Sequence, residues 1–458
     1  MNVIIALTVT GMLNLFGGIF NYKKLTPFIS VLGIISALIL NSLYWNTNTT
    51  FFHHMMVEDN YSVAFSAVCL SLGAFLILFY NRFIGENDHH LPEVLSIIVF
   101  SIAGAIVMVS YTNLLMLFLG VEILSLAFYI LAGLKKKELS SNEAAMKYFL
   151  MGAFSTGFLL FGITLIYGAS ASFDLTAIAA FVKEGGTTTN YLLLCGVLLI
   201  LVGLLFKVAA APFHFWTPDV YQGAPTIITA FFATVGKIAS FAAFYRLFSL
   251  CFAPIAAEWS SVIWCVAIIT MFIGNITALQ QKSLKRMLAY SSIAHAGYML
   301  LALLAPAYIG ASAILFYSVA YGIASMSAFI CLHIVQTQTN TDEVSGFTGL
   351  AQKNKPLALI TTISMLSLSG IPLTAGFFGK FYLFSSAISN GYVLLVCLAV
   401  INSFISIYYY FKPVIESYFK TSHTNNVIQL KSTETILLII LSIATIVLGI
   451  LPSLIPSI

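Results

Sequence analysis

Apolar residues fill almost the whole chain in long stretches, which short polar or Gly/Pro-rich joints separate. A helix that crosses a bilayer needs about 20 mainly apolar residues. Cutting the chain at its joints therefore predicts fourteen transmembrane helices, so we expect an all-α polytopic membrane protein. The expected spans are 3–20, 25–45, 61–84, 92–110, 112–134, 144–168, 190–214, 226–249, 257–280, 288–306, 309–335, 356–388, 391–412 and 433–455.

Two further segments do not fit a transmembrane helix. Residues 174–184 are short and amphipathic, which is typical of a helix that lies in the membrane interface. Residues 413–432 are polar, and we expect them to form a linker before the last helix. The first twenty residues lack a basic leading region and a small-residue cleavage site, so we interpret them as a retained first span.

The composition supports a membrane protein and argues against several other classes. The chain is 60% hydrophobic and 8% charged, whereas soluble domains have about 25% charged residues. Its six cysteines are scattered and form no C-x-x-C pair, which argues against a zinc site, a cysteine-ligated cluster or a disulfide scaffold. No basic patch alternates with aromatic residues, so we expect lipid contacts and no nucleic acid partner.

The basic residues indicate the orientation of the chain. Loops that follow odd-numbered helices hold or border fifteen basic residues, and loops that follow even-numbered helices hold or border two, Lys183 and Arg246. Such an excess marks the cytoplasmic side, so both termini are expected outside. The fifteen are Lys23, Lys24, Arg82, Lys135, Lys136, Lys137, Lys147, Lys282, Lys285, Arg286, Lys353, Lys355, Lys412, Lys420 and Lys431.

Five ionisable residues are expected deep inside the spans rather than at helix ends or in loops. They are Glu122, Lys207, Lys237, His295 and Lys380. A charge at membrane depth costs ~2.5–3.5 kcal/mol on insertion scales, so such residues usually pair or line a polar path. Burial disfavours a charged lysine and a nearby carboxylate favours it, so a movable carboxylate lets a lysine take up and release a proton. Histidine can relay protons through its two nitrogens. The set predicts a hydrated proton relay.

A static role for each residue is the alternative. Glu122 and Lys207 would then form an ion pair that fixes helix packing. Lys237 would have a structural role within its helix. Lys380 would extend its amine toward the interface among its phenylalanine neighbours, and His295 would make a hydrogen bond between helices.

Two of the expected helices carry helix-breaking residues beside a lysine. In LLFKVAAAPFHFWTPDVYQGAPT, Pro212 follows Lys207, and in LSLSGIPLTAGFFGKFYLF, Gly370 and Pro372 precede Lys380. Proline removes a backbone donor and interrupts a helix. Unwound backbone at membrane depth must line a cavity or be covered by protein. We therefore expect a hydrated pocket beside each lysine; a simple kink is the alternative.

The two breaks lie five helices apart, which predicts an internal duplication. A unit with an odd number of helices inverts its copy, as in many transporters. Glu122 would then match His295, and Lys207 would match Lys380. The expected parts are three helices in 1–91, a five-helix unit in 92–250, its inverted copy in 251–412, and a linker with the last helix in 413–458.

Long blocks of the sequence resemble the proton-translocating antiporter-like family of NADH–quinone oxidoreductase, respiratory complex I. The resemblance covers about residues 90–415 and includes FLGVEILSLAFYILAG, KRMLAYSSIAHAGYML and both lysine-containing blocks quoted above. It implies that Glu122 modulates the neighbouring Lys207. It further implies that Lys237 is the central relay residue, that His295 bridges toward the last site, and that Lys380 lies at the far end of the channel.

The resemblance also implies a setting in the bacterial inner membrane. The chain would be one subunit of a translocase, coupled to quinone reduction elsewhere and in contact with other membrane-arm subunits. NADH, FMN, iron–sulfur clusters and quinone would lie on partner subunits, and the chain has no G-x-G-x-x-G motif. A Mrp-type cation/proton antiporter is one alternative, although one intramembrane carboxylate offers few cation ligands. A non-transporting assembly scaffold is the other.

Overall fold

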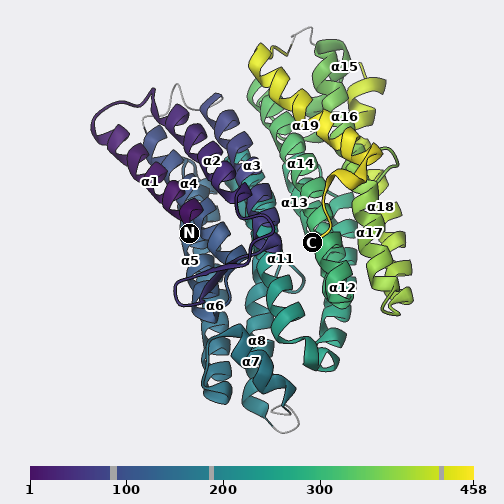
Figure 1. The fold of residues 1–458 in the computed structure, drawn as a ribbon. Helices are drawn as coiled ribbons and strands as arrows, with labels where there is room; N and C mark the ends of the chain where they lie inside the picture. The colour runs from purple at the N-terminus through teal and green to yellow at the C-terminus, as the bar shows by residue number, and fades with distance from the viewer. Residues whose placement is uncertain (83–89, 185–189, 422–427) are drawn as a thin grey trace.

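The structure is a computed structural model that describes residues 1–82, 90–184, 190–421 and 428–458. Within those residues, eleven helices are long and apolar enough to cross a membrane, and three shorter apolar helices accompany them. Together they match the fourteen expected spans one to one, although residues 83 and 84 of the expected span 61–84 lie outside the described part. The chain is therefore a multi-pass, mainly helical membrane protein (Figure 1).

The N-terminal block contains three helices and a small hairpin that the sequence did not predict. Its elements are α1 (Asn2–Ile19), α2 (Thr26–Ser42), β1 (Thr49–Phe51), β2 (Met56–Glu58) and α3 (Asn60–Tyr80). Strands of three residues are too short to produce a readable alternation of polar and apolar positions. The two strands pair antiparallel and are a small addition to the all-α fold that the sequence predicted.

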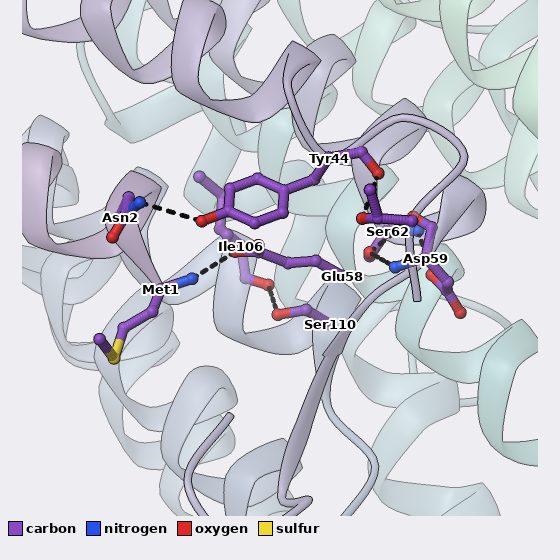
Figure 2. Close-up of polar contacts among 9 residues, drawn as sticks. Met1, Asn2, Tyr44, Glu58, Asp59, Ser62, Ile106 and Ser110 are labelled. Atoms are coloured by element: carbon purple, nitrogen blue, oxygen red, sulfur yellow. Dashed lines mark hydrogen bonds and ion pairs between the residues drawn. The ribbon is translucent and has the colours of Figure 1, made fainter. Parts of the chain in front are cut away.

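The hairpin leads directly into α3 and holds α1 in place. Asp59 caps α3, since its carboxylate accepts a hydrogen bond from the backbone of Ser62 at 2.7 Å. Figure 2 shows the Met1 amine directed at Glu58, with the Asn2 amide donating to the Tyr44 hydroxyl at 2.9 Å. These contacts tie α1, α2 and α3 together at one end of the bundle.

The first unit follows the expected order of helices. Its elements are α4 (Leu91–Ser110), α5 (Leu114–Ala132), α6 (Leu139–Ser170), α7 (Leu175–Lys183), α8 (Tyr191–Lys207), α9 (Trp216–Gly223), α10 (Thr226–Phe231), η2 (Phe232–Gly236), α11 (Lys237–Arg246) and η3 (Leu247–Cys251). The short helix α7 matches the expected segment 174–184. The last span is continuous but contains π-helical turns, one of which, η2, ends immediately before Lys237. Such turns frequently occur at functional sites.

The second unit also contains a broken helix, between α16 and α17. Its elements are η4 (Ala253–Ile255), α12 (Ala256–Leu279), α13 (Leu284–Leu300), η5 (Leu301–Leu304), α14 (Ala307–Thr339), η6 (Val344–Phe347), α15 (Leu350–Lys353), α16 (Lys355–Ser369), α17 (Ala375–Ile388) and α18 (Val393–Phe419). The chain then forms α19 (Ser432–Ile450) and η7 (Pro452–Leu454).

One predicted boundary was wrong at the end of the second unit. Helix α18 contains Pro413 and continues to Phe419, so the first residues of the expected linker 413–432 are helical. Charged residues there indicated a loop, but a helix that leaves the hydrocarbon region can carry them. Residues 422–427 of the expected linker lie outside the described residues.

Corresponding helices pack alike in the two units. Helix α4 packs on α5 and α11 as α12 packs on α13 and α18, and α6 packs on α8 and α9 as α14 packs on α16 and α17. The helix crossings also match. Between α4 and α5, Gly104 and Gly120 lie in close contact with the backbone of the facing helix, and between α12 and α13, Gly274 and Gly297 do the same. This correspondence is what two inverted five-helix repeats with discontinuous helices produce.

Candidate functional site

Lys207 is the last residue of α8, where the first broken helix begins. The chain leaves the helix here because Ala209 takes a left-handed backbone conformation and Pro212 follows. The Lys207 amine donates a hydrogen bond to the Ser125 hydroxyl on α5 at 2.7 Å. The break and the lysine therefore occur together, as the sequence predicted.

Glu122 lies one turn before Ser125 on α5, on the same face of that helix. Its carboxylate is within electrostatic range of Lys207, but among the described residues the two form no ion pair within 4.0 Å. One carboxylate oxygen is buried without a hydrogen-bond partner in the described structure. The static ion pair between Glu122 and Lys207 is therefore not what the structure contains.

Lys237 begins α11, directly after the π-helical turn η2, and is 3% exposed. Its amine reaches α13, where it donates to the Ser292 hydroxyl and to the Ser292 backbone carbonyl, each at 2.5 Å. Helix α11 belongs to the first unit and α13 to the second. Lys237 thus joins the two units through a polar contact inside the protein.

Lys380 lies on α17, just after the second broken helix, and is buried. Its amine donates to the Ser369 carbonyl at the end of α16 at 2.7 Å and to the Ser403 hydroxyl on α18 at 2.9 Å. It points into the bundle, so the alternative in which Lys380 extends toward the interface does not apply. Gly370 makes room for it, since Gly370 adopts a φ of 85° and a side chain there would meet the lysine.

His295 lies on α13, between α14 and α18, and is 3% exposed. Its Nδ1 contacts the Tyr317 hydroxyl at 2.5 Å and its Nε2 contacts the Tyr410 hydroxyl at 2.9 Å. The histidine therefore does make hydrogen bonds between helices, as the static alternative required. The same bonds place a protonatable group on each side of the ring, so they also suit a relay.

A common feature unites the three lysines. Each amine bonds to a serine hydroxyl, and none has a carboxylate partner within 4.0 Å in the described part of the chain. A hydroxyl can accept a hydrogen bond from an ammonium group and can donate one to a neutral amine. Each lysine thus keeps a hydrogen-bond partner in both protonation states, which is what a proton carrier requires.

The structure groups the predicted residues into two clusters. Glu122 and Lys207 form the first, around α5 and α8. His295 forms the second with Lys237 and Lys380, both of which are within its electrostatic range. Helix α13 links this second cluster because it carries both His295 and the serine that holds Lys237.

Lys285 is a buried lysine that the sequence wrongly placed in a loop. The Ser283 hydroxyl caps α13, so the helix begins at Leu284, four residues earlier than expected. Lys285 is consequently 3% exposed, and its amine donates to the carbonyls of Gln222 and Ala224 at 3.0 and 2.5 Å. The serine cap was the only sequence feature that could have revealed it.

A polar cavity of about 890 Å³ opens beside Lys285. Its lining includes Lys135, Glu138, His333 and Asp342, together with backbone and side chains around the start of α10. The cavity is large and polar enough to hold several water molecules. No cluster of three or more His, Cys, Asp or Glu side chains in the described ranges could hold a metal ion.

Asp219 on α9 joins three helices next to this cavity. Its carboxylate accepts hydrogen bonds from Lys147 on α6 at 2.7 Å and from Arg286 on α13 at 2.9 Å. Partial burial raises the pKa of Asp219, but the hydrogen bonds from the two cations outweigh that effect and lower the pKa below its ordinary value. The short helix after the first break is thereby anchored to both units.

Comparison with known proteins agrees with this arrangement. Residues 110–406 match the family described as NADH:quinone oxidoreductase/Mrp antiporter, TM. A protein of Trichlorobacter lovleyi named NADH-quinone oxidoreductase subunit N is 40% identical over 456 residues, which cover 98% of this chain and 94% of that protein.

Two solved structures show the same fold. A chain of respiratory complex I from Thermus thermophilus with bound aureothin is 31% identical, with a TM-score of 0.86 and coverage of 99% of this chain and 98% of that one. A chain of the Mrp complex from Dietzia sp. DQ12-45-1b is 20% identical, with a TM-score of 0.83 and coverage of 99% and 94%. At that lower identity, the second likeness concerns the fold alone.

Proposed function

Since this chain belongs to the family of NADH-quinone oxidoreductase subunit N, we propose that it is a proton-translocating subunit in the membrane arm of a respiratory NADH–quinone oxidoreductase. The relatives that carry this name match nearly the full length of the chain. The observation that carries the proton-moving role is a set of three lysines inside the bundle, each held by a serine hydroxyl; Lys237 and Lys380 are buried and Lys207 is partly buried. A buried charge with a purely structural role is usually paired with an opposite charge.

In the proposed mechanism, protons move from the cytoplasm to the outside along Glu122, Lys207, Lys237, His295 and Lys380. Conformational and electrostatic changes caused by quinone reduction in other subunits supply the driving force. When Glu122 approaches Lys207, it favours the charged amine, and when it recedes, the amine releases its proton. The contact of Lys207 with Ser125, rather than with Glu122, leaves the carboxylate free to move.

Water-accessible space supports a path from the cytoplasmic side. The cavity beside Lys285 is lined by residues such as Lys135, which the distribution of basic residues places on the cytoplasmic side. Lys285 and Ser292 lie seven residues apart on α13, about 10 Å along the helix axis. The cavity would thus bring water to within about two helical turns of the serine that holds Lys237.

The remaining parts of the proposal concern the setting of the chain. NADH, FMN, iron–sulfur clusters and quinone would bind to partner subunits, so this chain would have no redox centre. It would lie in the bacterial inner membrane with both termini outside, which the distribution of basic residues supports. Other membrane-arm subunits would be its protein partners.

Purification of the chain from native membranes tests the proposal. We expect it to co-isolate with flavin- and cluster-containing subunits and to be required for NADH-driven proton pumping. Sodium-dependent proton flux without NADH would instead favour a Mrp-type antiporter, which shares the fold. A scaffold predicts a third result, in which replacing the buried charges reduces the amount of assembled complex and leaves the turnover of each complex unchanged.

A further inference from the structure

We propose that the Tyr410 hydroxyl, together with Ser291, is the group through which a proton reaches His295, and that Tyr317 only positions the histidine ring. The inference rests on the proposed proton-translocating function and adds to it two residues that no sequence pattern singled out. Tyr410 lies on α18 and Ser291 on α13. Both are buried.

The two tyrosines approach His295 from opposite sides of its ring. The Tyr317 hydroxyl contacts Nδ1 at 2.5 Å, and the Tyr410 hydroxyl contacts Nε2 at 2.9 Å. A neutral imidazole donates from one nitrogen and accepts at the other, whereas a protonated imidazole donates from both. One of the two tyrosines must therefore donate its hydrogen to neutral His295 and must turn that hydrogen elsewhere when the ring is protonated.

Only Tyr410 has a place to turn its hydrogen in the described part of the chain. Its hydroxyl also contacts the Ser291 hydroxyl. The Tyr317 hydroxyl has His295 as its one hydrogen-bond partner among the described residues. A proton that arrives through a chain of hydroxyls can therefore reach the ring at Nε2, through Tyr410, and not at Nδ1. In this transfer Tyr410 donates to Nε2, and Nδ1 donates to Tyr317.

The proton-transfer step then follows from these contacts. The O–H bond of Tyr410 breaks as an N–H bond forms at Nε2 of His295. The Tyr410 oxygen takes the hydroxyl proton of Ser291, and the Ser291 oxygen takes the incoming proton. The net result is one proton moved to His295, with both hydroxyls restored and the ring carrying a positive charge.

The position of Ser291 connects this step to Lys237. The next residue, Ser292, accepts the hydrogen bond from the Lys237 amine. The two adjacent serines of α13 thus contact the lysine on one side and the Tyr410–His295 pair on the other. A proton released by Lys237 would reach Ser291 within one turn of a single helix.

Packing accounts for the role of Tyr317. The Tyr317 ring lies against α17 at Gly379, where any larger side chain would collide with the ring. The Tyr317 ring is also parallel to the ring of Tyr321. The ring is consequently fixed by its neighbours. Removing the hydroxyl alone should leave the Tyr317 ring in place and remove one hydrogen bond that orients His295.

The test compares four variants of the assembled complex in inverted membrane vesicles: Tyr410→Phe, Ser291→Ala, Tyr317→Phe and Tyr245→Phe. Tyr245 is the matched control, because it is a buried tyrosine whose hydroxyl donates to the Ala307 carbonyl and, among the described residues, contacts neither His295 nor Ser291. Proton uptake driven by NADH is measured in H₂O and D₂O and normalised to flavin content. A hydroxyl relay should be slower in D₂O, whereas a purely structural defect should not change the isotope effect.

We expect Tyr410→Phe to slow proton uptake about tenfold or more, because positioned proton-transfer groups contribute 10²–10⁴-fold and water replaces them only in part. Ser291→Ala should slow it several-fold, and Ser291→Thr, which retains the hydroxyl, should restore it. Tyr245→Phe should change the rate less than twofold. Tyr317→Phe, which removes one hydrogen bond to His295, should slow the rate less than Tyr410→Phe does and should leave the isotope effect unchanged. Equal losses in Tyr410→Phe and Tyr317→Phe would overturn the inference. So would an isotope effect in Tyr410→Phe that equals that of the wild type.

His295→Phe separates this inference from the proposed function. If His295→Phe slows proton uptake while Tyr410→Phe and Ser291→Ala do not, the histidine relay stands and the role of Tyr410 is refuted. If His295→Phe leaves proton uptake unchanged, the relay through His295 is refuted together with the inference. If Tyr410→Phe does not assemble, the Ser291→Ala and Ser291→Thr pair decides the question, because only a hydroxyl relay distinguishes them.

Discussion

Replacing Lys237 distinguishes a titrating lysine from a fixed charge. Lys237→Met removes the amine and keeps a flexible side chain, whereas Lys237→Arg keeps a positive charge that does not titrate in proteins. If the lysine serves only as a fixed charge between α11 and α13, arginine should function and methionine should fail. If it carries protons, both variants should pump poorly.

The contacts of Lys237 indicate that the methionine variant still folds. It loses two hydrogen bonds from a charged amine, to the carbonyl and hydroxyl of Ser292. At ~1.5–3 kcal/mol each, these bonds contribute ~3–6 kcal/mol. The variant also avoids the ~2.5–3.5 kcal/mol cost of a charge at membrane depth. The net loss is thus at most about 3.5 kcal/mol, which is below the 5–15 kcal/mol stability typical of folded proteins.

The assay is NADH-driven acidification of inverted membrane vesicles, followed with a pH-sensitive dye. Assembly is measured in the same vesicles as NADH oxidation with an artificial electron acceptor. We expect both variants to assemble and to pump about tenfold more slowly than the wild type or worse, since positioned acid–base groups contribute 10²–10⁴-fold. An arginine variant that pumps at more than about half the wild-type rate, judged against that range, would refute the reasoning.

Three further substitutions test other parts of the account. Glu122→Gln should reduce proton pumping in assembled complex, because the amide cannot favour the charged form of Lys207; pumping at the wild-type rate would count against the modulating role. Asp219→Asn should weaken the link between α6, α9 and α13 by about 1 kcal/mol, since the carboxylate is one-third exposed, and should lower the thermal midpoint slightly. Gly120→Leu should cost about 1–3 kcal/mol by overpacking the α4–α5 crossing and should reduce the amount of complex in membranes, with normal amounts arguing against the close crossing.

The sequence was sufficient to predict the spans because hydropathy depends on local composition. Each of the fourteen stretches has its helix, and both predicted breaks, after Lys207 and before Lys380, lie where Pro and Gly indicated. These features follow from residues that are close together in the chain. The boundaries assigned to the four parts of the chain stay a prediction.

The hydrogen-bond partners of Lys207, Lys237 and Lys380 could not be predicted. Ser125, Ser292 and Ser403 lie on other helices, 82, 55 and 23 residues along the chain from the lysines that they contact, and their positions depend on helix packing. A serine in an apolar helix more often bonds to the carbonyl of the preceding turn, so its identity alone indicates little. The tyrosines around His295 were missed for the same reason.

Local details were mispredicted where a few residues outweigh composition. The Ser283 cap brings Lys285 into α13 and makes it a buried residue, although the basic sequence around it is typical of a loop. Pro413 does not end α18, although proline usually interrupts a helix. The three-residue strands before α3 form next to the Asp59 cap and carry no pattern long enough to read.

The most direct test of the central claim is the proton pumping of the purified complex in liposomes when Lys207, Lys237 and Lys380 are all replaced by methionine. The measured quantity is the number of protons moved per NADH oxidised, with flavin content confirming intact complex. Proton movement through this subunit predicts that assembled complex loses a substantial part of its pumping. Undiminished pumping by fully assembled complex would contradict the account.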